Sequence, residues 1–397
     1  MENTNAERCR SMPMKIIFLH HANYCKGGIE RMMAMKANYL SEQMGWEVIL
    51  LTYEQNGEPF PYELSLKVRQ VDLDVHLYSA YKSAYPLRYF KKLRLRRQLS
   101  QALHVFLKKE NADVVISTDK DAHELKALFK AHTTEKLVVE AHTGMVDHEM
   151  QVQRTNSFWR RLIARKDLVR LKLAVSYFDV LIALTEEDAY CWNMYIQTFV
   201  MPNALTHYPS VVANLPDEKK RVISVGRLDY QKGQDLLLMA WQEVERHHPD
   251  WSLYIYGDGK EMSNLLSSIS AHNLHRVSIH SATTNIYAEY MKSDFLVCSS
   301  RWESFGLVLI EAMACGIPVV SFNCNNGPRN IITVGVDGLL VKNGDVEDLS
   351  FKICQMIEQK ESRILMGTEA RKNVARFREE KIIPHYLDVL NDIINKH

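Results

Sequence analysis

The sequence predicts an α/β protein made of two doubly wound, Rossmann-like domains. Its 397 residues are more than one ordinary hydrophobic core organises. Short β-branched runs alternate with longer stretches of helical periodicity, which is the pattern of βαβ units in a parallel sheet. A segment with three prolines and little periodicity, residues 201–220, separates two such series. Together these observations indicate two domains of similar size.

The expected strands follow the chain in order, each ending where a helical pattern begins. In the first half they are Lys15–His20, Glu47–Thr52, Val68–Leu73, Asp113–Ser117, Lys136–Ala141 and Val180–Leu184. In the second half they are Arg221–Val225, Ser252–Tyr256, Val277–His280, Phe295–Cys298, Pro318–Ser321 and Gly338–Val341. Ligands of such folds bind beyond the carboxyl ends of the strands, so we expect the functional residues in the strand-to-helix loops.

These patterns set the expected domain boundaries. A disordered polar head over 1–12 precedes an N-terminal domain over 13–203, and a linker over 204–220 leads to a C-terminal domain over 221–379. The last segment, 380–397, has apolar residues at helical spacing after Pro384 and predicts a final amphipathic helix.

Composition excludes several classes of protein. The formal net charge of +1 gives no global field to hold nucleic acid. Seven cysteines without a Cys-x-x-Cys pair disfavour both a disulfide framework and a thiolate zinc site. No apolar run reaches the roughly 18 to 20 residues of a membrane span. We therefore expect a soluble cytoplasmic protein.

Two loops carry residue types suited to phosphate or sugar. Gly27 and Gly28 close the loop after the first strand, where a helix N-terminus adds partial positive charge. Arg227 and Lys232 lie five apart in the loop after strand 221–225, and two cations from one loop can converge on a diphosphate. The alternative for the glycine pair is an ordinary turn, and the alternative for the two cations is an ordinary surface loop. Neither motif by itself establishes a binding site.

The strongest motif is a pair of carboxylates, Glu303 and Glu311, eight residues apart after the strand Phe295–Cys298. Gly306 marks the expected turn into a helix, whose first N–H groups would point at a ligand. Glu311 falls inside this otherwise apolar helix, a costly place for a carboxylate without a partner. A hydrogen bond to a ligand hydroxyl, such as a ribose diol, would supply one.

Glu303 and Glu311 match the E-x7-E motif of family 4 glycosyltransferases, retaining enzymes of the GT-B fold, and the chain resembles this family from end to end. The Gly27-Gly28 pair, Arg227 with Lys232, the turn Gly257-Asp258-Gly259 and the segment Met201-Pro202-Asn203 occur in the family's order. The resemblance implies two Rossmann-like domains facing each other across a cleft, the first for the acceptor and the second for a nucleotide sugar. It also implies a C-terminal helix that crosses back to the N-terminal domain.

The same resemblance implies roles for individual residues. Arg227 and Lys232 would hold the donor diphosphate, Glu311 the ribose and Glu303 the hydroxyls of the donor sugar. His142, in the segment EAHTG, would lie near the sugar and acceptor, although a plain loop histidine is the alternative. The implied catalytic residues are Glu303, His142, Arg227 and Lys232. The implied donor-binding residues are Gly27, Gly28, Arg227, Lys232, Gly257, Ser304, Phe305, Gly306, Leu307 and Glu311.

No metal or other cofactor is expected. The sugar transferases that need a metal use an Asp-x-Asp motif, and Asp72-Leu73-Asp74 has this spelling but falls within a strand pattern. The expected partners are a nucleotide-sugar donor, with UDP as the nucleotide, and a glycan or lipid-linked glycan acceptor.

A basic segment, RYFKKLRLRR over 88–97, lies in the first half of the chain with six basic residues in ten. With a second basic segment after residue 154 and interleaved aromatic residues, it predicts contact with an anionic membrane or a lipid pyrophosphate. A solvated helix face is the alternative, and nucleic acid is disfavoured. The residues of this expected patch are Arg88, Lys91, Lys92, Arg94, Arg96, Arg97, Arg160 and Arg161.

The sequence thus predicts a retaining, metal-independent glycosyltransferase. It would move a hexose or N-acetylhexosamine to a glycan acceptor, expected to be lipid-linked, in polysaccharide or glycolipid synthesis at the cytosolic face of the inner membrane. Two alternatives stay open: a nucleotide-sugar epimerase of the same architecture and a non-catalytic nucleotide-sugar-binding protein.

Overall fold

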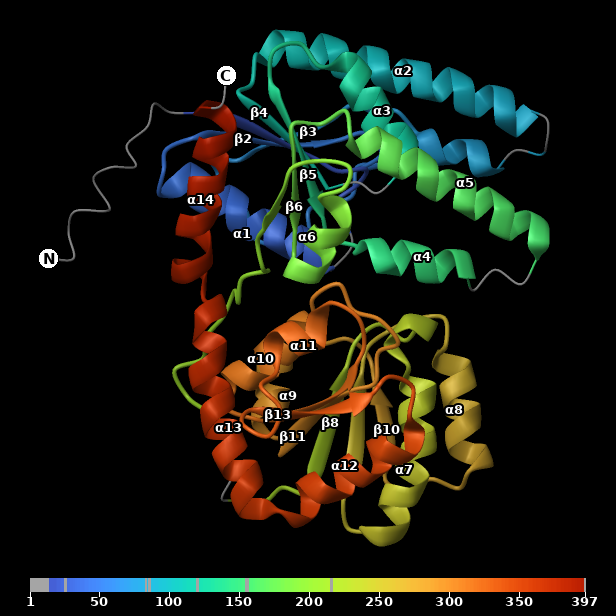
Figure 1. The fold of residues 1–397 in the computed structure, drawn as a ribbon, viewed down its shortest axis with the longest axis vertical. Coiled ribbons are helices and arrows are strands. Elements are labelled where there is room, and N and C mark those ends of the chain that lie inside the picture. The colour runs from blue at the N-terminus through green and yellow to red at the C-terminus, as the bar shows by residue number, and fades with distance from the viewer. Residues whose placement is uncertain are drawn as a thin grey trace, which may run out of the picture. The chain divides into compact units, whose positions relative to one another are not determined.

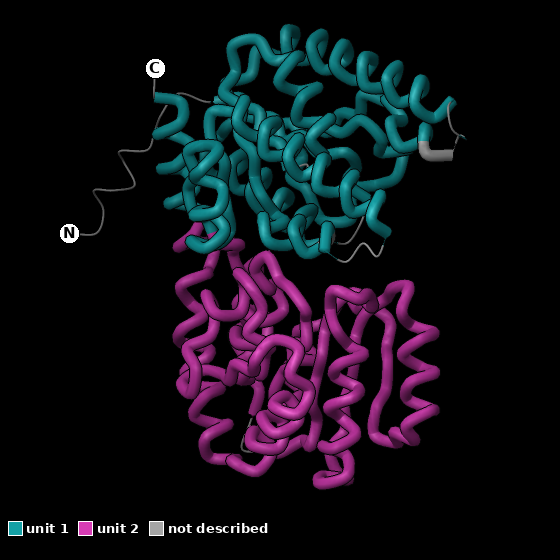
Figure 2. Tube along the Cα trace, turned by 45° about the vertical axis from the view of Figure 1, so that its right-hand side comes forward, with its two compact units in different colours: residues 1–201, 383–397 teal, residues 202–382 magenta. Residues whose placement is uncertain are grey.

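A computed structural model describes residues 14–395 except 25–26, 83, 85–86, 119–120, 154–156 and 215–216 (Figure 1). The predicted disordered head over 1–12 therefore lies outside the described residues. The chain divides into two units, coloured separately in Figure 2. Unit 1 contains Met1–Met201 and Ile383–His397, and unit 2 contains Pro202–Ile382.

Unit 1 is built on a parallel sheet of seven described strands in the order β3-β2-β1-β4-β5-β6-β7. Apolar, largely β-branched strand sequences such as KIIFL and VVIS are buried, as expected of a sheet covered on both faces. The strands are β1 (Lys15–Leu19), β2 (Glu47–Thr52), β3 (Arg69–Asp72), β4 (Val114–Ser117), β5 (Lys136–Ala141), β6 (Val180–Ala183) and β7 (Thr198–Val200).

Helices cover both faces of this sheet. Ile17 and Leu19 of β1 pack in one core with Leu103 and Leu107 of α2, and α3 lies beside both α2 and α5 (Figure 1). The helices of unit 1 are α1 (Gly28–Glu42), α2 (Leu87–Glu110), α3 (Ala122–Ala131), α4 (Met145–Gln153), α5 (Phe158–Val175), α6 (Glu186–Trp192) and the greater part of α14 (Glu379–Asn395).

Unit 2 repeats the architecture with a parallel sheet of six described strands in the order β10-β9-β8-β11-β12-β13. Its strands are β8 (Arg221–Val225), β9 (Ser252–Tyr256), β10 (Val277–His280), β11 (Phe295–Cys298), β12 (Val319–Asn323) and β13 (Gly338–Lys342). The parallel pairing in both units confirms the predicted α/β, doubly wound class.

Helices of unit 2 pack against its sheet, with Trp241 of α7 fully buried in a core shared with β9 and α12. They are α7 (Gln234–His247), α8 (Met262–Ala271), α9 (Ile286–Met291), α10 (Leu307–Ala314), α11 (Gly327–Ile331), α12 (Val346–Glu358) and α13 (Lys360–Val374). A short 3-10 helix, η2 (Tyr230–Lys232), precedes α7.

The strand order reverses once in each sheet, between β1 and β4 in unit 1 and between β8 and β11 in unit 2. Loops that leave a parallel sheet in opposite directions open a crevice at such a switch point. The loops after β8 and β11 are those that carry Lys232 and Glu303. The fold therefore brings the two strongest sequence motifs to the position where doubly wound proteins bind ligands.

Three details differ from the sequence expectations. The short strand β7 was not expected, because its three residues are half-buried and carry no alternating pattern. Helix α14 begins at Glu379, before Pro384, and the buried Ile382 and Ile383 anchor its first turns. Residues 202–214 fall within unit 2, where the Ala213 N–H donates to the Cys315 carbonyl at 2.8 Å.

Candidate functional site

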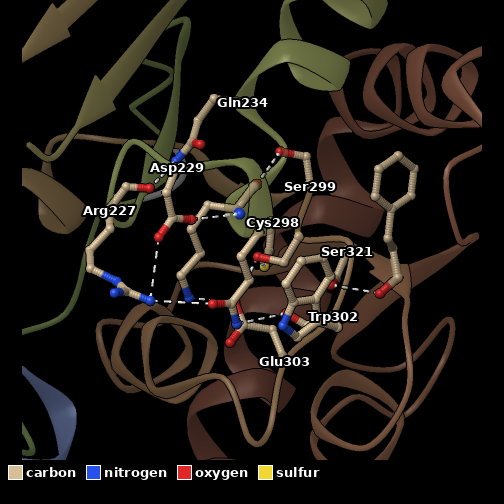
Figure 3. A network of polar contacts seen from close by, with 12 residues as sticks. Arg227, Asp229, Gln234, Cys298, Ser299, Trp302, Glu303 and Ser321 are labelled. Atoms are coloured by element: carbon tan, nitrogen blue, oxygen red, sulfur yellow. Dashed lines mark hydrogen bonds and ion pairs between the residues drawn. The ribbon is translucent and has the colours of Figure 1, made fainter. Parts of the chain in front are cut away.

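The centre of the candidate site in unit 2 is an ion pair between Lys232 and Glu303 (Figure 3). Lys232 Nζ lies 2.6 Å from Glu303 Oε1, and the two side chains are 17% and 7% exposed. The Ser300 hydroxyl donates to the same carboxylate oxygen at 2.6 Å. A lysine and a glutamate 71 residues apart in sequence thus meet at the carboxyl edge of the sheet.

The backbone around this pair is closely fitted. Asp229 caps η2 by accepting a hydrogen bond from the Lys232 N–H at 3.3 Å. Gly233 follows with a φ of 65°, and a Cβ there would lie 2.0 Å from the Ser299 carbonyl oxygen. Only glycine suits both the conformation and the contact. The loop after β8 is therefore held directly against the loop after β11.

The charges at this site favour an ionised lysine. Burial acts to lower the pKa of Lys232, but the Glu303 carboxylate outweighs it and the pKa is raised. Burial and Glu303 together raise the pKa of the nearby Cys298 thiol. The site therefore presents an ammonium group, and Cys298 stays a neutral thiol.

Arg227 lies beside this pair but extends into solvent. Its side chain is 72% exposed, with Nη2 3.4 Å from an Asp229 carboxylate oxygen and 3.2 Å from Gln231 Oε1. Gln231 in turn donates to the Trp302 carbonyl at 3.1 Å. A weakly held, exposed guanidinium can reorient toward an anionic ligand at little cost.

Glu311 has a protein partner that the sequence did not reveal. It is buried in α10 at 4% exposure, and the Tyr290 hydroxyl donates to its Oε2 at 3.0 Å. Burial and the Glu311 charge raise the pKa of Tyr290 well above its usual value, so this hydroxyl keeps its proton. The partner that a buried carboxylate requires is thus supplied, at least on one oxygen, by α9.

The segment 304–307 forms the entry to α10, as expected. Gly306 is the N-cap with a φ of 102°, and α10 begins at Leu307. Phe305 is buried against Phe377, with ring centroids 5.4 Å apart. The N-terminal amides of α10, beside Ser304, are thereby fixed near the Lys232–Glu303 pair.

Glycines also bring neighbouring loops into backbone contact. A Cβ at Gly257 would lie 1.9 Å from the Gly226 carbonyl oxygen, and one at Gly327 would lie 2.0 Å from the Phe305 carbonyl oxygen. The Gly327 N–H donates to the Glu303 carbonyl at 3.1 Å. The loops after β8, β9, β11 and β12 therefore form one closely packed edge.

In unit 1, the glycine pair stands at the start of α1. Gly27 is the N-cap, and its carbonyl accepts a hydrogen bond from the Tyr62 hydroxyl at 3.0 Å. Gly28 is the first helical residue. The buried Glu30 carboxylate lies at this helix start, so close that a Cβ on Gly27 would meet its Oε2 at 2.4 Å. An adjacent carboxylate suits ligand hydroxyls better than a phosphate.

His142 lies just past the end of β5 and is buried. Its Nε2 is 3.2 Å from Glu140 Oε2, and the two side chains are 4% and 3% exposed. Sequence reasoning selected His142 but missed Glu140, whose position in the apolar run LVVEA was the available signal. The ring is held by the protein on its Nε2 side.

The predicted basic patch lies on α2 and α5, which both neighbour α3. Buried positions of α2 begin only at Leu99, and those of α5 only at Leu171. The first halves of both helices therefore lie mainly outside the core. Their large exposed apolar side chains are Leu87, Tyr89, Phe90, Leu93, Phe158, Trp159, Leu162 and Ile163.

Two further sequence points can be checked. Within the described residues, no group of three or more His, Cys, Asp and Glu side chains is arranged to hold a metal ion. Asp72, from the Asp-x-Asp spelling, accepts hydrogen bonds from the Thr52 hydroxyl at 3.0 Å and the Gln55 N–H at 3.1 Å. Of the helices described, none is long and apolar enough to cross a membrane.

Solved structures with the same fold identify the architecture. The sucrose-phosphate synthase of Thermosynechococcus elongatus has a TM-score of 0.77 at 20% identity, covering 97% of this chain and 100% of that chain. Anabaena HepE, in complex with UDP and glucose, has a TM-score of 0.72 at 19% identity, covering 95% and 99%. The class defined by these neighbours and the two sheets is the GT-B glycosyltransferase fold, as predicted.

Sequence comparisons point to a family within this class. Residues 210–373 match the model of "Glycosyl transferases group 1". An uncharacterized glycosyltransferase of Haemophilus influenzae is 28% identical over 92% of this chain and 96% of its own length. The amylovoran biosynthesis glycosyltransferase AmsD of Erwinia amylovora is 27% identical over 95% and 99%. Residues 210–373 are thus similar to group 1 glycosyltransferases, and the whole chain is similar in length and sequence to these two glycosyltransferases.

Proposed function

We propose that this chain transfers a hexose or N-acetylhexosamine, with retention of anomeric configuration, from a UDP-sugar to a lipid-linked glycan acceptor. The observation that carries the proposal is the Lys232–Glu303 pair, with Nζ 2.6 Å from Oε1, at the switch point of the unit 2 sheet. A cation for a phosphate and a carboxylate for sugar hydroxyls stand side by side there.

Each residue of this site has a role in the proposal. Lys232 and the mobile guanidinium of Arg227 bind the diphosphate, and the N-terminal amides of α10 after Gly306 bind the β-phosphate or sugar. Glu303 accepts hydrogen bonds from sugar hydroxyls, for which Oε2 is available in addition to the oxygen bonded by Lys232. Glu311 accepts a ribose hydroxyl while Tyr290 holds its other side at 3.0 Å.

The proposed reaction is a front-face substitution. The bond between the sugar C1 and the phosphate oxygen breaks, the acceptor oxygen bonds to C1 from the same face, and the departing phosphate takes the acceptor proton. The protein stabilises charge developing on the diphosphate with Lys232, Arg227 and the α10 amides. His142 is proposed to lie near the donor sugar and the acceptor. No metal is needed in this scheme, because cationic side chains and amides carry the electrostatic role.

Support for the donor and the acceptor class comes from similar proteins. HepE, which shares the fold, is seen with UDP and glucose. AmsD takes part in amylovoran biosynthesis. By this similarity we propose that the donor nucleotide of this chain is UDP. We also propose that the chain helps to build a cell-surface polysaccharide or glycolipid.

The acceptor is proposed to reach unit 1 at a membrane. The first halves of α2 and α5 combine basic residues such as Arg97 and Arg161 with exposed aromatic residues such as Phe90 and Trp159. Such surfaces bind anionic headgroups, each cation contributing about 1 kcal/mol. The proposed location is the cytosolic face of the inner membrane.

The test of the proposal is a thermal-shift panel of UDP, GDP, ADP and their common sugar conjugates on the purified chain. Binding to the folded state raises the melting temperature, so we expect a shift confined to the uridine series. No shift with any nucleotide would contradict the donor assignment. Donor converted without any acceptor would indicate the epimerase alternative, and donor bound but never converted would indicate a non-catalytic binding protein.

A further inference from the structure

Glu140 is a buried carboxylate on the face of β5 that points away from the core shared with α2, α3 and α5. The alternating residues Leu137, Val139 and Ala141 pack in that core. Glu140 therefore points to the opposite face, because side chains alternate along a strand. It is 3% exposed there. A buried carboxylate is costly unless it is paired and hydrogen-bonded.

Three donors from three separate elements meet at this carboxylate. The Lys36 ammonium of α1 lies 2.8 Å from Oε2, and His142 Nε2 lies 3.2 Å from the same oxygen. The Tyr386 hydroxyl of α14 donates to Oε1 at 2.6 Å. Lys36 Nζ also lies 4.4 Å from the centroid of the Tyr386 ring. The terminal helix and α1 thus converge on the carboxylate that bonds His142.

The arrangement fixes which imidazole nitrogen carries a proton. Burial acts to raise the pKa of Glu140, but Lys36 and His142 outweigh it and hold the pKa well below its usual range. An ionised carboxylate only accepts hydrogen bonds, so the hydrogen between the two groups belongs to His142 Nε2. In the neutral ring Nδ1 is then the acceptor, and Glu140 sets both the tautomer and the orientation.

We propose that Glu140 is a positioning residue for His142, and that Tyr386 brings the C-terminal helix into the same unit by holding the other carboxylate oxygen. The role of His142 in sugar transfer rests on the proposed function. The positioning itself rests on the contacts of Glu140 alone. A simple structural ion pair with Lys36 would require neither the histidine nor the tyrosine.

Different donors bond the two oxygens of the Glu140 carboxylate, so each contact can be removed by itself. Tyr386→Phe removes a hydrogen bond from Oε1 and leaves Lys36 and His142 on Oε2. Glu140→Gln removes the charge that holds the His142 tautomer. Because this variant leaves Lys36 without a counter-charge, the double variant Lys36→Met/Glu140→Gln serves as the folding control. Tyr195→Phe, which removes a hydroxyl elsewhere in unit 1, is the matched control.

The first measurement is ¹⁵N NMR of the histidine rings, with the His142 signals assigned by their loss in His142→Gln. We expect the Nε2-protonated tautomer in the unmodified protein. In Glu140→Gln and in the double variant we expect a mixed or reversed tautomer, with the proton affinity of the ring lowered at least tenfold. An unchanged tautomer and proton affinity would overturn the proposal whatever the activity. His148 lines the same small cavity as Glu140, so its signals must be assigned separately.

The second measurement is steady-state transfer from the UDP-sugar. We expect kcat to fall at least tenfold in Glu140→Gln and about threefold in Tyr386→Phe, with the donor KM unchanged and Tyr195→Phe unaffected. An altered tautomer with unchanged kcat would overturn the functional part of the proposal. If the unmodified protein transfers no sugar while its tautomer depends on Glu140, the proposed function fails and the positioning of His142 stands.

Discussion

The two units hold their candidate residues in different ways. In unit 2, Glu303 and Glu311 are buried and Lys232 is partly buried; all three are bonded to other side chains, and neighbouring loops touch backbone to backbone. In unit 1, the basic halves of α2 and α5 are mainly exposed. The family match covers 210–373, which lies in unit 2. The unit that matches the family model is therefore the one whose candidate residues are held by side-chain and backbone contacts.

The largest effect is expected from the Lys232–Glu303 pair. Lys232→Ala and Glu303→Ala should each lower kcat/KM by about 10³, since the proposed function has both residues act on the charge and hydroxyls of the donor. Breaking a buried pair also costs about 3–5 kcal/mol of stability. The double variant Lys232→Met/Glu303→Gln leaves no lone charge and should melt closer to the unmodified protein while staying inactive. Turnover within threefold of normal in either alanine variant would contradict the site.

A smaller effect on a different property is expected in unit 1. Charge reversal in Arg96→Glu/Arg97→Glu should weaken binding to vesicles with anionic lipid by more than about tenfold, because each basic residue contributes about 1 kcal/mol. The control Arg246→Glu/Lys372→Glu alters two exposed cations of unit 2. Co-sedimentation over a salt series measures both. Equal loss in the two variants, or binding independent of salt, would refute a specific patch.

The Tyr290–Glu311 bond separates a binding role from a structural one. Tyr290→Phe should raise the donor KM about fivefold at constant kcat, the effect of one hydrogen bond worth about 1 kcal/mol. Tyr287→Phe changes a neighbouring ring, whose centroid lies 6.1 Å from that of Tyr290, and is the control. A lower melting temperature with an unchanged KM would show that Glu311 serves the fold only.

The last prediction concerns the pH dependence of stability in unit 1. Burial raises the pKa of Asp188 to about 7, with a contribution from Asp147. Since the folded pKa lies above the unfolded value near 3.8, stability from this carboxyl is present below pH 3.8 and is lost as the pH rises to about 7. The stability of Asp188→Asn relative to the unmodified protein should therefore increase by up to about 1 kcal/mol per pH unit in that window.

Urea unfolding of both proteins at pH 5, 6, 7 and 8 measures this difference. Met145 N–H and Trp192 Nε1–H donate to the carboxylate at 2.6 and 3.2 Å, so a constant offset is expected in addition to the slope. Parallel curves across the four pH values would contradict a raised pKa.

The sequence predicted one part of this molecule well for a physical reason. Strand ends and the 303–311 spacing are local, and the parallel topology brings local motifs together at a sheet edge. All twelve expected strands begin within one residue of the observed strands. The fold class and the placing of functional residues in strand-to-helix loops therefore followed from short-range patterns, whereas the ion pair between Lys232 and Glu303 was not predicted.

The partners of these motifs could not be found in the same way. Tyr386 reaches Glu140 across 246 residues, and Tyr290 meets Glu311 across 21 residues from a helix with its own pattern. Each choice depends on side-chain direction within the folded unit, which periodicity does not encode. The position of Glu140 in an apolar strand indicated that its carboxylate needs a hydrogen-bonding or charged partner, but it did not indicate which residue that partner is.

The glycines at the edge of unit 2 constrain how this protein can be recombined with its relatives. Gly233 lies against the Ser299 carbonyl, and Gly327 lies against the Phe305 carbonyl, at distances that admit no Cβ. A chimera that exchanges only one loop of such a pair would place unmatched backbones in contact. The loops after β8, β11 and β12 should therefore be exchanged as one block, because a graft of a single loop would separate backbones that fit each other.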